Sequence, residues 1–108
     1  ISAANARAYR FHTGIARSHD SFYIDREAEI DSYWSKRGVL GADMETAALY
    51  TIGHLRGIRT MSILNNVVAF EEDTLDAIGS YVDGESAAMQ GEAHEILTAL
   101  DAFAEICR

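Results

Sequence analysis

Residues 38–50 read Gly-Val-Leu-Gly-Ala-Asp-Met-Glu-Thr-Ala-Ala-Leu-Tyr. An apolar lead-in gives way here to a helical pattern that runs to Gly57, a residue type that ends helices. We therefore expect Asp43 and Glu45 in the first turn of a helix. The unpaired N–H groups and the positive end of the helix dipole favour ionised carboxylates at such a position.

Two carboxylates around a methionine suggest sugar binding. An ionised carboxylate only accepts hydrogen bonds, whereas a vicinal diol offers two donors. The thioether and stem of Met44 would lie against an apolar face of the sugar. Asp43, Met44 and Glu45 are therefore the candidate pentose-binding residues. The alternative is that the acidic residues only complement the helix dipole.

The string Asp43-Met44-Glu45-Thr46-Ala47-Ala48 resembles the Glu-Met-Glu-(Ala/Ser)-Ala signature of the nucleoside phosphorylase family, which contains hexameric purine nucleoside phosphorylases and uridine phosphorylases. Upstream, residues 18–23 read Ser-His-Asp-Ser-Phe-Tyr and are similar to the family's Ser-x-Asp-x-Phe-Tyr segment. Downstream, residues 57–64 resemble its next buried strand. These segments occur in the family's order and cover nearly the whole chain.

The resemblance implies an α/β fold: a phosphorylase/hydrolase-like mixed sheet flanked by helices. Residues 1–108 would form the C-terminal half of a single nucleoside phosphorylase-like domain. A sheet cut in two leaves an unpaired edge, so we expect no independent folding. The implied activity is phosphorolysis, in which phosphate attacks C1′ of the sugar as the base departs. Glu45 would be the catalytic residue, fixing the ribose hydroxyls with help from Asp43 and Met44.

The resemblance also implies a base pocket. Phe22 falls where the family stacks an aromatic ring on the nucleobase, although without the resemblance an ordinary core aromatic is the alternative. Uridine phosphorylases carry a Gln-x-Arg pair nearby, of which this chain offers only Arg26. Purine enzymes carry a proton-donating Ser-Asp pair where this chain has Val67 and Val68, preceded by Asn66. An apolar wall cannot donate a proton, so the sequence favours uridine or another pyrimidine over a purine.

The distribution of charge limits the partners. The formal net charge is −8, and no Lys or Arg lies between Arg59 and Arg108, where acidic residues recur throughout. Such a field repels nucleic acid and anionic membranes. It also cannot hold phosphate unaided. The resemblance implies as partners a nucleoside, inorganic phosphate as co-substrate, the remaining N-terminal half of the subunit, and further copies in a dimer-based homo-oligomer up to a hexamer. No other cofactor is expected.

Metal binding and membrane insertion are not indicated. The four histidines and the single cysteine lack the spacing of metal ligands, so no metal site is expected. One cysteine cannot form an intrachain disulfide, which suits a reducing cytoplasm. No apolar run approaches the length of about 20 residues that spans a bilayer.

Hydrophobic periodicity predicts the elements. We expect strands at residues 10–16 and 60–68, helices at 25–36, 44–56 and 83–107, and an acidic loop at 70–80. The helix at 44–56 would bury a stripe of apolar side chains that consists of Met44, Ala48, Ile52 and Leu55.

Two alternative functions follow from the same residues. A nucleosidase would replace phosphate by water, but the absent Ser-Asp pair disfavours it. A non-catalytic module of this family, kept for assembly or ligand sensing, would need no phosphate-binding groups.

Overall fold

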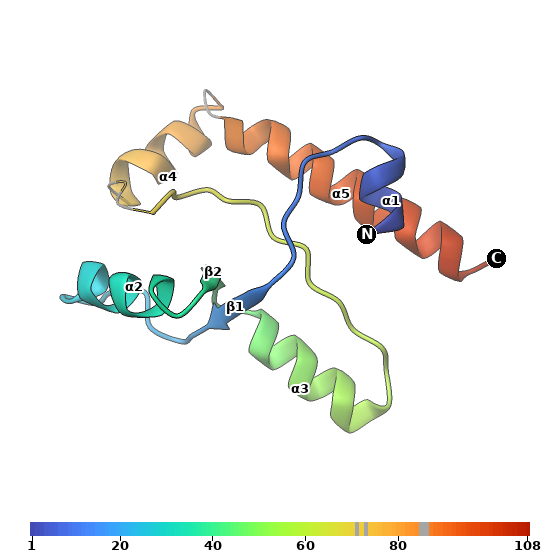
Figure 1. The fold of residues 1–108 in the computed structure, drawn as a ribbon, viewed down its shortest axis with the longest axis horizontal. Coiled ribbons are helices and arrows are strands. Elements are labelled where there is room, and N and C mark those ends of the chain that lie inside the picture. Colours follow the sequence, from blue (N-terminus) through green and yellow to red (C-terminus); the bar gives the residue numbers. More distant parts are fainter. Residues whose placement is uncertain (71, 73, 85–86) are drawn as a thin grey trace. The chain divides into compact units, whose positions relative to one another are not determined.

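A computed structural model describes residues 1–70, 72, 74–84 and 87–108 of the chain (Figure 1). Contacts divide the chain into two compact units. The first contains Ile1–His12 and Ile63–Arg108, and the second contains Thr13–Ser62. The described elements are α1 (Ser2–Ala6), β1 (Ile15–Ser18), α2 (Glu27–Ser35), β2 (Val39–Asp43), α3 (Thr46–Arg56), α4 (Thr74–Val82) and α5 (Ala87–Ile106).

The second unit contains a two-stranded parallel sheet. β1 pairs with β2 so that Ile15 faces Val39 and Ser18 faces Asp43, with a register shift after Ile15. Parallel strands need a long crossover, and α2 supplies it and packs on β2 (Figure 1). The predicted strand at 10–16 is thus displaced, because hydrogen bonding to β2 begins only at Ile15. The helices and the parallel strands are compatible with the α/β fold that the resemblance implies, and the mixed sheet flanked by helices stays a prediction.

The predicted end of α3 is confirmed. Gly57 adopts a left-handed conformation with φ of 66°. The N–H of Ile58 donates to the carbonyl of Gly53 at 2.9 Å, and the N–H of Gly57 donates to that of His54 at 3.2 Å. A glycine cap of this kind satisfies the last carbonyls of a helix. The start differs from the prediction, because Asp43 is the last residue of β2 and Glu45 is the N-cap.

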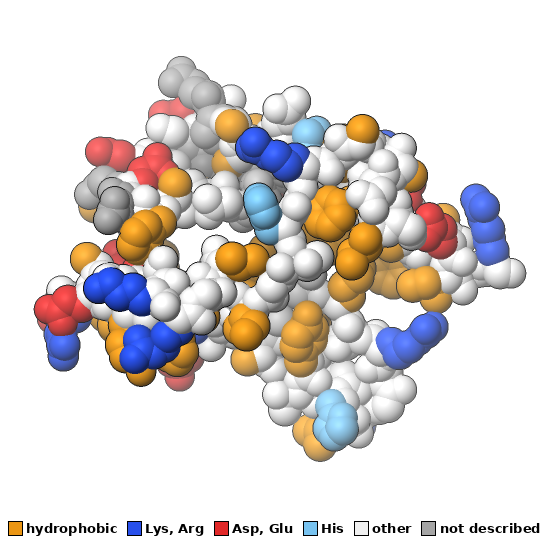
Figure 2. All heavy atoms as spheres, viewed as in Figure 1, with side chains coloured by type: hydrophobic (Ala, Val, Ile, Leu, Met, Phe, Trp, Pro, Cys, Tyr) orange, Lys and Arg blue, Asp and Glu red, His pale blue; other side chains and the backbone are white. Residues whose placement is uncertain are grey.

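The predicted buried stripe of α3 is wrong. Ile52 is 60% exposed and Leu55 is 75% exposed, and Gly53 is the buried residue of this helix. A Cβ at Gly53 would overlap the side chain of Thr60, so the segment after the helix folds back onto this position. The pattern predicted the helix correctly, but the apolar side chains of the predicted stripe are exposed rather than covered. Figure 2 shows apolar side chains at the surface.

In the first unit, α1 packs against α5. Ala3 and Ala4 are only 2% and 6% exposed, and such small side chains let two helices approach closely. Arg7 forms an ion pair with Asp101 of α5, with its Nε 2.5 Å from one carboxylate oxygen and a second nitrogen 3.1 Å from the other. These contacts connect segments that are far apart in the sequence.

The predicted strand at 60–68 does not form. A strand needs a neighbouring backbone to pair with, and the two strands of the described chain pair with each other. The side chain of Asn65 instead donates to the carbonyl of Ala88 in α5 at 2.7 Å. This confirms the general rule that a part-buried amide finds a partner, here the backbone of a helix.

The predicted loop at 70–80 is also wrong, since α4 occupies Thr74–Val82. Leu75, Ile78 and Val82 recur at helical spacing, and the acidic residues and Gly79 obscured this pattern. Residues 71 and 73 of the predicted loop lie outside the described residues, as do residues 85 and 86 of the predicted C-terminal helix. That helix is confirmed from Ala87 to Ile106.

We predict that Asp101 contributes a pH-dependent part of the stability. The hydrogen bond from Arg7 lowers the pKa of Asp101 below the ordinary value of 3.8. A pKa that is lowered in the folded state stabilises the protein at pH values above the ordinary pKa. This contribution is lost as the pH falls through the folded-state pKa. Urea unfolding should therefore show a difference between wild type and Asp101→Asn that shrinks on acidification. A difference that stays constant with pH would contradict this prediction.

Two glycine substitutions test the contact between Asn65 and α5. A Cβ at Gly91 would overlap the Asn65 side chain, whereas a Cβ at Gly79 in α4 would meet no described heavy atom within 4 Å apart from its chain neighbours and the backbone of its own helix. Gly79→Ala should raise the free energy of unfolding by up to about 1 kcal/mol. Gly91→Ala has the same gain in helix propensity, but it should be less stable than Gly79→Ala by about 1 kcal/mol, because Asn65 loses its hydrogen bond to Ala88. Equal melting temperatures for the two variants would contradict the packing.

Candidate functional site

The candidate site lies where the two parallel strands end. Ser18 at the end of β1 faces Asp43 at the end of β2. The chain then passes through Met44 and Glu45 into α3. In open α/β sheets, ligands bind beyond the carboxyl ends of the strands. The local fold therefore places the three candidate pentose-binding residues where a ligand is expected.

The carboxylate of Asp43 is largely engaged with the protein itself. Its Oδ1 accepts hydrogen bonds from the Ser18 hydroxyl at 2.8 Å, the Glu45 N–H at 3.0 Å and the Thr46 N–H at 2.7 Å. Its Oδ2 is buried and has no hydrogen-bond partner among the described residues. The carboxylate thus holds the backbone at the start of α3 in the manner of a helix cap.

Two opposing effects set the pKa of Asp43. Burial favours the neutral acid, but the hydrogen bonds from Thr46, Ser18 and Glu45 stabilise the anion. The hydrogen bonds prevail, so the pKa of Asp43 lies below its ordinary value. The site therefore carries a fixed negative charge at neutral pH.

Ser18 completes this network. Its hydroxyl donates to Asp43 and accepts a hydrogen bond from the Ala47 N–H at 3.0 Å. The sequence placed Ser18 in a family-like segment but assigned it no role. Its position at the end of a strand is a signal that could have identified it.

Met44 and Glu45 are accessible. Met44 is 38% exposed, and its N–H donates to Glu45 Oε2 at 3.1 Å. The Glu45 side chain is exposed and gives no capping bond to α3. An accessible carboxylate with unused lone pairs can accept hydrogen bonds from sugar hydroxyls. The ribose contacts of Met44 and Glu45 stay a prediction.

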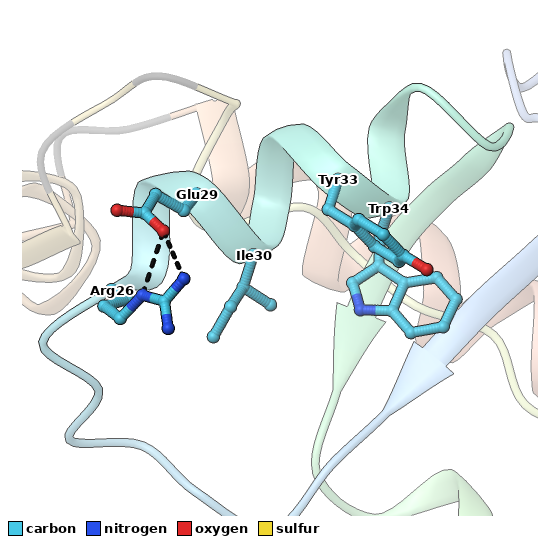
Figure 3. A pocket seen from close by; sticks show the side chains of 5 residues that line it. All are labelled: Arg26, Glu29, Ile30, Tyr33 and Trp34. Carbon is cyan, nitrogen blue, oxygen red and sulfur yellow. Dashed lines mark hydrogen bonds and ion pairs between the residues drawn. The ribbon is translucent and has the colours of Figure 1, made fainter.

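The predicted base-pocket residues Phe22 and Arg26 each contact a residue nearby in the sequence. Phe22 is 48% exposed and meets Tyr23 edge to face, with 5.2 Å between the ring centroids. Arg26 is ion-paired with Glu29, its guanidinium nitrogen 2.6 Å from the carboxylate. Arg26 also lines a pocket of about 260 Å³ together with residues of α2 (Figure 3). Figure 3 shows Glu29, Ile30, Tyr33 and Trp34 as the other lining side chains.

Asn66, Val67 and Val68 belong to the first unit, whereas the candidate pentose-binding residues belong to the second. Asn66 is exposed and the two valines are half-buried. Their joining with Phe22 and Arg26 in one base pocket stays a prediction.

The described part of the chain contains neither a cluster of metal-ligand side chains nor a membrane-spanning helix. Among residues 1–70, 72, 74–84 and 87–108, no three His, Cys, Asp or Glu side chains gather as metal ligands would. No helix in the same ranges is both long and apolar enough to cross a bilayer.

The fold and the site define a protein of helices and a small parallel sheet, with an acidic candidate site at the strand ends. A family model described as "Phosphorylase superfamily" matches residues 1–100. The chain therefore belongs to this family, and the resemblance to nucleoside phosphorylases is confirmed.

Curated relatives support this membership. The purine nucleoside phosphorylase DeoD-type of Clostridium novyi (strain NT) is 45% identical over 60 residues, covering 53% of this chain and 25% of the relative. The protein of that name from Roseobacter denitrificans is 38% identical over 64 residues, covering 59% and 27%. The uridine phosphorylase of Thermococcus kodakarensis is 27% identical over 113 residues, covering 94% and 40%. The matches thus span between a quarter and two fifths of these relatives. No solved structure matches the chain.

We predict that Asp43→Ala destabilises the protein through the start of α3. The substitution removes the acceptor for the Glu45 and Thr46 N–H groups, and loss of a side-chain cap costs about 1–2 kcal/mol. Asp20→Ala, at an exposed aspartate shortly after β1, is the matched control and should change stability by less than about 0.5 kcal/mol. Equal thermal shifts for the two variants would show that the cap is unimportant.

Proposed function

We propose that this chain supplies the pentose-binding part of a nucleoside phosphorylase site. The observation that carries the proposal is the position of Met44 and Glu45: both are accessible, and both follow β2 at the end where ligands bind in parallel sheets. Membership of the phosphorylase superfamily and the names of the curated relatives support the same reaction class.

In the proposed reaction an oxygen of inorganic phosphate forms a bond to C1′ of the sugar. The N-glycosidic bond breaks at the same carbon, and its electron pair leaves with the base. Glu45 accepts hydrogen bonds from the ribose hydroxyls and holds C1′ in line with phosphate. Positioning of this kind can contribute several kcal/mol to lowering the barrier. A carboxylate near the sugar also stabilises the positive charge that develops on it.

We propose that the phosphate-binding groups come from another segment or from a neighbouring subunit. A helix N-terminus is a common anion site, because its N–H groups have no partner within the helix. In α3, however, the N–H groups of Thr46 and Ala47 already donate to Asp43 and Ser18. The ionised Asp43 also repels an anion. No Lys or Arg lies between Arg59 and Arg108 that could compensate.

The comparisons bear on which base the proposed site takes. The sequence favoured a pyrimidine from Val67 and Val68, but the comparisons do not support this preference. Relatives named purine nucleoside phosphorylase reach 45% identity, whereas the uridine phosphorylase of Thermococcus kodakarensis reaches 27% over a longer match. The decisive assay therefore tests both inosine and uridine.

We predict that Glu45→Gln lowers kcat/KM for the preferred ribonucleoside by more than about tenfold. The amide cannot accept the hydroxyl hydrogen bonds as strongly as the carboxylate, and such bonds to charged groups are worth about 1.5–3 kcal/mol. The measurement is release of base from inosine and from uridine, each with and without phosphate. Glu27→Gln is the matched control, because Glu27 is an acidic residue in the first turn of α2.

The outcomes separate the alternatives. If Glu45 only complements the helix dipole, the two variants behave alike and turnover stays near that of wild type. Base release without phosphate would identify a nucleosidase. Absence of base release from both nucleosides in the presence of phosphate would favour a non-catalytic module.

A further inference from the structure

The Ser18 hydroxyl connects the ends of β1 and β2 with the start of α3 at the candidate site. It donates to Asp43 at the end of β2 and accepts from the Ala47 N–H in the first turn of α3, while Ser18 itself ends β1. The backbone adds a further link, since the His19 N–H donates to the Asp43 carbonyl at 3.0 Å. The connection that carries Met44 and Glu45 is therefore fixed at both of its ends.

The chemistry of this bridge requires a hydroxyl. The ionised Asp43 carboxylate only accepts hydrogen bonds, and the Ala47 N–H only donates. A group placed between them must donate on one side and accept on the other. Serine and threonine do both, whereas alanine and valine do neither.

Asp43 is poorly placed to bind the sugar directly. Three donors from the protein already use its Oδ1, and its Oδ2 is buried. The Glu45 N–H is one of these donors, at 3.0 Å, so the carboxylate acts on the backbone of the residue proposed to hold the ribose. Its effect on a ligand would pass through Glu45.

We propose that Ser18 and Asp43 are positioning residues, which together set the backbone of Met44 and Glu45 for pentose binding. This inference rests on the proposed function, in which Glu45 contacts the ribose. It assigns Ser18 a role in nucleoside binding and gives Asp43 an indirect role in place of the predicted direct contact with ribose.

The test compares Ser18→Thr with Ser18→Val. These side chains have nearly the same shape and both suit a strand, but only threonine keeps the hydroxyl. We expect Ser18→Val to raise KM for the nucleoside on the order of tenfold and to leave KM for phosphate within about twofold. Ser18→Thr should restore the nucleoside KM. Ser35→Ala, at an exposed serine that ends α2, is the control for a serine outside the network.

A second readout does not depend on activity. Amide hydrogen exchange followed by NMR should show that Ser18→Val speeds exchange at Glu45, Thr46 and Ala47 by about tenfold or more. The Ala47 N–H loses its acceptor, and the Asp43 carboxylate, which accepts from the Glu45 and Thr46 N–H groups, loses the hydroxyl that holds it. The amides in the second half of α3 should be unchanged. If exchange instead accelerates throughout α3, Ser18 has a general structural role and the positioning role is overturned.

The two readouts distinguish failure of this inference from failure of the proposed function. A wild-type protein that cleaves a nucleoside, with Ser18→Val equal to Ser18→Thr in nucleoside KM and in exchange, would overturn the positioning role alone. A wild-type protein that cleaves neither nucleoside, with faster exchange confined to Glu45, Thr46 and Ala47 in Ser18→Val, would overturn the proposed function and retain the network as the device that fixes this connection.

Discussion

The hydrogen bonding of the Asp43 carboxylate is the interaction on which the candidate site depends. A partly buried carboxylate loses hydration, and it remains ionised here because a hydroxyl and two backbone N–H groups replace the lost water. The same bonds satisfy donors at the start of α3 that otherwise have no partner. One side chain thus joins the sheet to the helix and fixes the residues between them.

Polar contacts rather than large apolar side chains dominate the described structure. The buried hydrophobic residues are small: Ala3, Ala4, Ala77 and Ala88. In the first unit, an ion pair and small side chains hold α1 on α5. The side chain of Asn65 connects the segment around it to α5 through its hydrogen bond to Ala88. In the second unit, the strand ladder and the network of Ser18 and Asp43 have this role. Each of these contacts depends on geometry, so single substitutions can test them.

The charge of the chain and the geometry of the site both favour sugar binding over phosphate binding. Carboxylates suit the hydroxyls of a sugar and the positive charge that develops on it during phosphorolysis. They are unsuited to phosphate, and the first N–H groups of α3 already have acceptors within the protein. The proposed function therefore assigns sugar binding to this part of the chain and phosphate binding to other groups. The pocket on α2 has a different composition, with Arg26 next to aromatic and aliphatic side chains.

The sequence by itself determined the features that depend on neighbouring residues. Helical spacing gave α2, α3 and most of α5, Gly57 gave the end of α3, and the acidic motif around Met44 gave the family. Such features need only local backbone preferences or a short string of residues. The tertiary structure decided what depends on distant partners. The pairing of Ser18 with Asp43 joins two residues 25 positions apart, and only the register of the sheet brings them together. Residues 60–68 have a strand-like sequence but do not form a strand, because strand formation requires a neighbouring backbone and not a pattern alone.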